Sequence, residues 1–108
     1  MTAMIVRIYW GRIVPGSLPS IEDVYRKYDA ASVQGMRARF VSQDVNDPDS
    51  IYVVTFWHDV ESIERWVASD DYKVRITKAL RPFIVGAQSL SLSRVRVEDV
   101  AGLLPRIS

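Results

Sequence analysis

The chain has 108 residues, of which 48% are hydrophobic and 25% are charged, so the composition predicts one ordinary globular domain and excludes a disordered or fibrous chain. Lys and Arg total 14 against 13 Asp and Glu, and this balance excludes the strongly basic surface that nucleic-acid binding needs. The chain has no cysteine for disulfides, no apolar run of the roughly 18 residues that a membrane span needs, and no signal-peptide cleavage site, so we expect a cytoplasmic protein with no nucleic-acid or membrane partner.

The first third of the chain predicts a strand and an amphipathic helix. Residues 4–13 are rich in Ile, Val, Tyr and Trp and end at a Pro-Gly turn pair, which is typical of a strand followed by a loop. Ser20 followed by Asp23 then predicts a helix start, and Gly35 predicts a left-handed stop. The apolar stripe of this helix is formed by Ile21, Val24, Tyr25, Tyr28 and Ala31.

The middle of the chain predicts a hairpin. Residues 36–43 and 52–57 have strand patterns, and the sequence DVNDPDS between them predicts a turn. Arg37 and Arg39 fall on one face of the first of these strands. We expect them to form ion pairs with acidic residues at an interface, and the alternative is that they bind an acidic ligand.

Two short helices are expected after the hairpin. Asp59 can cap a helix that turns Ile63, Trp66 and Val67 inward. Ser69 can cap another helix, which ends at Pro82. The inward side of this second helix carries Tyr72, Ile76, Ala79 and Leu80.

The last strand is expected over residues 88–98, but its apolar residues change parity between Leu92 and Val95. This change predicts a bulge, or a strand that passes into a second environment. Residues 99–108 are expected to form an irregular tail, so the predicted domain is 1–98.

The order β-α-β-β-α-β predicts a ferredoxin-like α+β fold, with one antiparallel sheet and helices on one of its faces. Residues 52–57 are apolar on both strand faces, although helices can cover only one. A bare apolar face of this kind is unusual on a monomer, so we expect a homodimer whose two sheets pack face to face.

Several motifs carry a resemblance to a known family. They are Gly35-Met36, RFVSQ at residues 39–43, YVVTFW at residues 52–57, and the following pattern of Glu61, Ile63, Trp66, Ser69 and Tyr72. With these motifs, roughly residues 4–97 resemble the antibiotic-biosynthesis monooxygenase family of dimeric α+β barrels. The family includes quinone-forming monooxygenases and haem-degrading monooxygenases, so the resemblance implies the fold more specifically than the reaction.

The pattern is most similar to the bacterial haem-degrading branch, which uses an Asn on the first strand, a Trp at the end of the third strand and a His that ligates the haem iron. Trp57 matches the Trp, whereas Gly11 and Ile76 stand at the Asn and His positions. An iron at that place would lack its proximal imidazole, and the single histidine, His58, falls on the opposite strand face from Trp57. We therefore expect no haem, no other cofactor and no metal.

The resemblance then implies cofactor-free chemistry, in which a small aromatic or polyketide-like phenol is bound in an apolar pocket, deprotonated and allowed to react with oxygen. The candidate site residues are Trp57 and Tyr72 for catalysis and Tyr28, Trp66, Arg75 and Ile76 for substrate binding. The sequence leaves two alternatives open: a non-catalytic dimeric barrel that binds a small hydrophobic ligand, and a divergent haem-binding member. Each aromatic candidate could instead fill the core.

Overall fold

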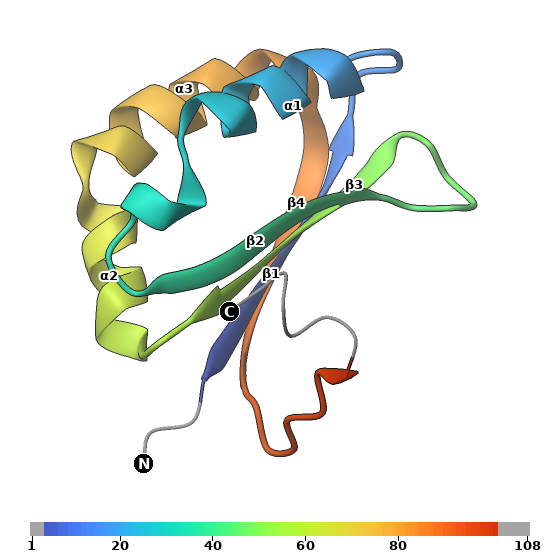
Figure 1. The fold of residues 1–108 in the computed structure, drawn as a ribbon. Coiled ribbons are helices and arrows are strands. Elements are labelled where there is room, and N and C mark those ends of the chain that lie inside the picture. Colours follow the sequence, from blue (N-terminus) through green and yellow to red (C-terminus); the bar gives the residue numbers. More distant parts are fainter. Residues whose placement is uncertain (1–3, 102–108) are drawn as a thin grey trace.

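The computed structural model describes residues 4–101, which form one antiparallel sheet of four strands in the order β2-β3-β1-β4. The helices cover a single face of this sheet (Figure 1). The predicted ferredoxin-like α+β fold is therefore confirmed. The strands are β1 (Ile5–Ile13), β2 (Met36–Gln43), β3 (Ser50–Trp57) and β4 (Ile84–Arg94). The helical segments are α1 (Leu18–Lys27), η1 (Ala30–Ser32), α2 (Val60–Ala68), η2 (Asp71–Ile76), α3 (Thr77–Leu80) and η3 (Arg81–Phe83).

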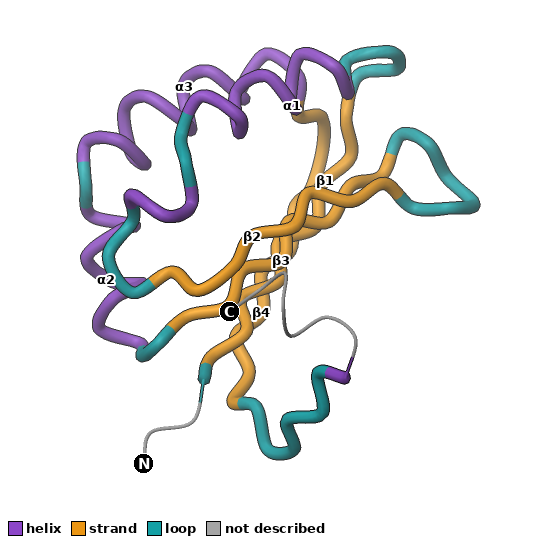
Figure 2. The backbone as a smooth tube through the Cα atoms, viewed as in Figure 1, coloured by secondary structure: helices purple, strands orange, loops and turns teal. Residues whose placement is uncertain are grey.

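The core lies between the sheet and the helices, and it has two clusters. One cluster consists of Ile13, Ile21, Ile51 and Val53, and the other of Ile5, Trp57 and Ile63. In β3 the residues facing the helices are buried and the alternate residues are half-exposed, as strand geometry requires. Figure 2 shows helices α1, α2 and α3 on one side of the strands only, so none of them covers the second sheet face.

Helix α1 differs from its prediction at both ends. It begins at Leu18 rather than after Ser20, and Pro19 lies in its first turn, where a residue without an N–H fits. It ends at Lys27, well before Gly35, because Tyr28 leaves the helical conformation and Asp29 starts the short η1 turn. Ser20 therefore lies inside the helix, and the predicted start was wrong. Gly35 is left-handed as predicted, with a φ of 86°, but it does not end this helix.

The two predicted caps of the second helical region are confirmed. Asp59 Oδ1 accepts hydrogen bonds from the Oγ (2.6 Å) and the backbone N–H (2.8 Å) of Ser62, and these bonds hold the pKa of the Asp59 carboxyl below its usual value. Ser69 Oγ accepts from the N–H of Tyr72 at 3.2 Å. The segment after Ser69 is a π-helix, however, in which the Thr77 N–H bonds to the Tyr72 carbonyl five residues back.

Strand β4 begins and ends four residues earlier than expected, at Ile84 and Arg94. Its bulge is also elsewhere: Gly11 pairs with Gln88 but Arg12 pairs with Val85, so two residues of β4 bulge out between these pairs. The parity change after Leu92 marks the end of the strand, which corrects the bulge predicted there. Of the predicted tail, residues 102–108 lie outside the described residues. No helix in the described range is long and apolar enough to cross a membrane.

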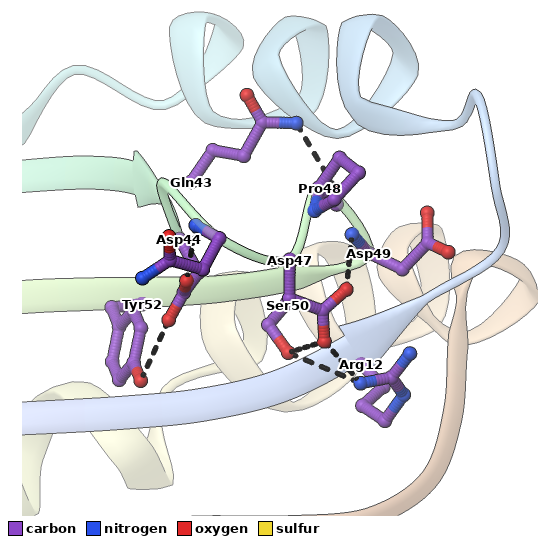
Figure 3. A network of polar contacts seen from close by, with 9 residues as sticks. Arg12, Gln43, Asp44, Asp47, Pro48, Asp49, Ser50 and Tyr52 are labelled. Atoms are coloured by element: carbon purple, nitrogen blue, oxygen red, sulfur yellow. Dashed lines mark hydrogen bonds and ion pairs between the residues drawn. The ribbon is translucent and has the colours of Figure 1, made fainter.

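The turn between β2 and β3 is held by its own carboxylates (Figure 3). Asp47 Oδ2 accepts from Arg12 Nη1 of β1 at 2.5 Å and from Ser50 Oγ at 3.0 Å. The hydrogen bond from Arg12 is the main cause that lowers the pKa of the Asp47 carboxyl. On the other side of the turn, Asp44 accepts from the backbone N–H of Asn46 at 2.8 Å. This network ties the hairpin turn to the end of β1.

Candidate functional site

A cavity of about 220 Å³ lies between the helix-facing side of the sheet and the helices. Every strand and most of the helical segments contribute to its wall. The apolar and aromatic lining residues are Tyr9, Tyr25, Met36, Val53, Trp57, Trp66, Tyr72, Ile76, Leu80 and Ile84. The remaining polar lining residues are Arg7, Arg39, Thr55, Thr77, Arg81 and Gln88. A small concave site with mostly apolar walls and a few polar groups is the usual form of a small-molecule site.

The tryptophans and Ile76 form the apolar wall. Trp57 is fully buried at the end of β3, and its indole Nε1 donates to Thr55 Oγ1 at 2.7 Å. Because this single donor is used inside the protein, Trp57 offers a ring surface to a ligand rather than a hydrogen bond. The rings of Trp66 and Tyr72 meet edge to face with centroids 5.8 Å apart.

Arg7 is the main polar group of the cavity. It lies on the helix-facing side of β1 and is only 7% exposed. Its Nη2 donates to the hydroxyl of Tyr72 at 3.0 Å, and its guanidinium carbon lies 5.6 Å from the centroid of that ring. Its Nε is buried, and no group among residues 4–101 accepts a hydrogen bond from it. The site thus presents a phenol hydroxyl held by a buried cation.

The other cavity tyrosines remain neutral donors. Tyr9 donates from its hydroxyl to Gln88 Oε1 at 2.6 Å, which links β1 to β4. Burial is the main cause that raises the pKa of both the Tyr9 and the Tyr25 hydroxyls. Neither phenol therefore ionises near neutral pH, and neither can act as a resident base.

Arg39 lies beneath α1, not at an outer interface. Its Nη2 donates to the carbonyls of Tyr25 (2.6 Å) and Tyr28 (2.5 Å), the last carbonyls of the helix, and its guanidinium lies 5.1 Å from the ring centroid of Tyr25. Burial lowers the pKa of this guanidinium. Arg37 is exposed, and β2 has a register shift between Met36 and Ala38 that separates the two arginines. The expectation that they share one strand face was wrong.

The structure brings four of the six predicted site residues together: Trp57, Trp66, Tyr72 and Ile76 all line the cavity. Tyr28 instead lines a second cavity, together with Trp66 and Arg65. Arg75 is exposed and pairs with Asp71. Sequence reasoning missed Arg7, although its place between Ile5 and Tyr9 on the inward side of β1 was a usable signal.

These residues do not fit haem held through histidine. Ile76 is a buried hydrocarbon side chain at the position where the resemblance places the ligand. His58 has an exposed imidazole (60%) and does not line the cavity. Within the described residues, no group of three or more His, Cys, Asp or Glu side chains is placed to hold a metal ion. A haem iron in this cavity would have no histidine ligand from the described residues.

Comparison with known proteins gives one family and one fold. The sequence profile of the antibiotic biosynthesis monooxygenase family matches residues 4–77. No curated protein gives a significant sequence match. Among solved structures, SnoaB, a cofactor-independent oxygenase from Streptomyces nogalater, has a TM-score of 0.75 and 16% identity, over 90% of this chain and 97% of that chain.

Two other solved structures are equally similar. A conserved protein from Methanosarcina mazei Go1 has a TM-score of 0.78 at 15% identity, over 88% of this chain and 95% of that chain. A protein from Pseudomonas aeruginosa has a TM-score of 0.73 at 16% identity, over 90% of this chain and 98% of that chain. At these identities the solved structures show a common fold and not a common substrate.

Proposed function

Because the chain belongs to the antibiotic biosynthesis monooxygenase family, we propose that it oxygenates a small aromatic or polyketide-like phenol in the cavity beneath its helices, without a cofactor. The observation that carries this proposal is the Arg7–Tyr72 pair set among aromatic walls. Such a site can hold a planar ring and stabilise negative charge on its oxygen. The common fold with a cofactor-independent oxygenase supports the reaction type.

The side chains of the cavity have separate roles in this reaction. Trp57, Trp66 and Ile76 hold the ring of the substrate and keep water from its face. The Tyr72 hydroxyl accepts from Arg7, so its own proton is free to bond to the substrate oxygen. The nearby guanidinium favours the phenolate over the phenol. No Asp, Glu or His is among the described lining residues, so the phenol proton passes to water. Tyr28 and Arg75 have no role in this scheme.

The electron balance needs no added reductant when the substrate is anthrone-like. A methylene carbon next to the phenolate ring loses two hydrogens and becomes a carbonyl. One atom of the oxygen molecule enters that carbonyl, and the other leaves as water with the two hydrogens. All of the electrons that reduce oxygen come from the substrate carbon, and the protein contributes binding, orientation and charge stabilisation.

Oxygen uptake tests the proposal directly. Hydroquinones and anthrone-like phenols are offered to the wild type and to Tyr72→Phe, Trp57→Phe and Tyr28→Phe, each first checked for folding by circular dichroism. We expect the wild type to take up oxygen faster than the buffer does. The rate should fall about tenfold or more in Tyr72→Phe, as it does when an oxyanion donor is lost, and it should also be lower in Trp57→Phe. Tyr28→Phe is the matched control, because Tyr28 lies outside the cavity.

The alternative is a binding protein without catalysis. It predicts no uptake above the blank with any of these compounds, together with ligand-dependent changes in tryptophan fluorescence. That result would overturn the oxygenase proposal. We also propose that the working form is a homodimer joined through the uncovered sheet face, because that face is apolar across three strands.

A further inference from the structure

The cavity contains three arginines that form no ion pair within the described part of the chain. Its described wall holds Arg7, Arg39 and Arg81 and no Asp or Glu. The cavity is therefore electrostatically suited to an anion.

Arg39 and Arg7 differ in how their donors are used. Arg39 bonds to two carbonyls at the end of α1, so its place has a structural explanation. Arg7 makes one side-chain hydrogen bond within the described residues, to the neutral hydroxyl of Tyr72. A guanidinium has five N–H donors, and burying it without an anionic partner is costly. The Nε of Arg7 is likewise buried and has no hydrogen-bond acceptor among the described residues.

We propose that the ligand of this cavity is an aromatic carboxylic acid whose carboxylate binds Arg7 while its ring lies against the tryptophan wall. This inference rests on the proposed function and deepens it by naming the class of substrate. A carboxylate matches the planar fork of a guanidinium, with two parallel N–H donors for two oxygens. It is also charged at neutral pH, whereas a phenol, with a pKa of about 10, arrives neutral. Arg7 would thus select the substrate before chemistry begins.

A pair of probes isolates the carboxylate. 3-Hydroxy-2-naphthoate and 3-hydroxy-2-naphthamide carry the phenol on the carbon next to the second group, so that Arg7 can hold the carboxylate while Tyr72 bonds to the phenol oxygen. The two probes differ in the charge of that second group. We expect calorimetric titration to show the acid binding at least about tenfold more tightly than the amide. Arg7→Met should remove this preference, because methionine keeps the volume but not the charge. Arg37→Met is the matched control, since Arg37 is exposed and lies outside the cavity.

Salt separates the buried site from general surface attraction. A preference that comes from Arg7 should persist at about 0.5 M salt, because buried pairs are screened less than exposed ones. Equal binding of acid and amide, no binding of either, or a preference that salt abolishes would overturn the inference. If Arg7→Met does not fold, Arg7→Lys replaces it. Lysine lacks the planar, two-donor guanidinium, so this variant should lose most of the preference for the acid over the amide. An unchanged preference in the folded variant would also overturn it.

The two proposals can fail separately. Acid-selective binding without oxygen uptake would remove the oxygenase reaction and leave the anion site. Oxygen uptake with neutral phenols and no preference for the acid would remove the anion site and leave the oxygenase reaction.

Discussion

Tyr9 and Gly11 share one space on the helix-facing side of β1. A Cβ atom at Gly11 would lie 2.5 Å from the Tyr9 hydroxyl oxygen and 3.0 Å from its ring carbon Cζ. The Tyr9 ring therefore covers the place that a side chain at residue 11 would need. The resemblance puts the asparagine of the haem-degrading branch at this position, so such a side chain would require Tyr9 to move and to release Gln88.

We predict that Gly11→Ala lowers the free energy of unfolding by about 2 kcal/mol, because it overpacks this space. In a Tyr9→Phe background, where the nearest clashing atom is absent, the same change should cost about 1 kcal/mol less. Urea unfolding of the four proteins in this double-mutant cycle measures the difference. Equal costs in both backgrounds would contradict the geometry.

The candidate site was predictable where strand parity, helical spacing or a family motif applied. Such patterns predicted Trp57 and Trp66 as site residues, and strand parity could also have predicted Arg7. Arg75 was expected to bind substrate, but it is exposed and pairs with Asp71. Tyr72 and Ile76 were expected on one side of their helix, and both line the cavity although the segment is π-helical. Residue periodicity alone does not reveal a π-helical turn.

The junction between β2 and α2 depends on Gly35. This glycine has a φ of 86°, and a Cβ there would overlap the Oγ and Cβ of Ser62 in the first turn of α2. Its carbonyl also accepts from the His58 N–H at 2.8 Å, directly before that helix. Conformation and close approach thus both require glycine at this point. The helix that carries Trp66 is positioned by this contact.

Gly16 provides a matched control for this junction, since it has a φ of 80° and no atom within 4 Å of its would-be Cβ. We predict that Gly16→Ala costs only the strain of the left-handed conformation, about 1 kcal/mol. Gly35→Ala adds the clash with Ser62 and should cost about 3 kcal/mol in all. Thermal or urea unfolding of both variants checks this. A Gly35→Ala protein as stable as Gly16→Ala would show that α2 yields to the extra atom.

Most elements could be predicted from the sequence, because alternation and caps are local signals. The bounds of strand β2 and the Asp59 cap of α2 match the prediction. The end of α1 could not be predicted in this way, since it is set partly by Arg39 from a different strand. The start of β4 was missed because its bulge interrupts the alternation that identifies a strand. Long-range contacts decided both boundaries.

The uncovered face of the sheet is apolar over three strands. The residue pairs that share this face put Val6, Ile8 and Trp10 of β1 opposite Phe56, Val54 and Tyr52 of β3. Phe40 of β2 extends the patch and meets Phe56 edge to face, with ring centroids 6.2 Å apart. On the other side the patch ends at β4, where Ser89, Ser91 and Ser93 pair with the same β1 residues. The patch therefore has an apolar centre and a polar border, as protein interfaces commonly do.

We predict that the wild type sediments as a dimer at micromolar concentration, with an interface of about 1,600 Å² or more. Val54→Lys should give a folded monomer, because the lysine is tolerated on a half-exposed face but would bury a charge between two sheets. Val74→Lys is the matched control, since Val74 is 52% exposed on the helical side, away from this face. It should remain dimeric. A wild type that sediments as a stable monomer would contradict the prediction and leave the apolar face without a partner. Dissociation by both lysine variants would instead place the contact on another surface.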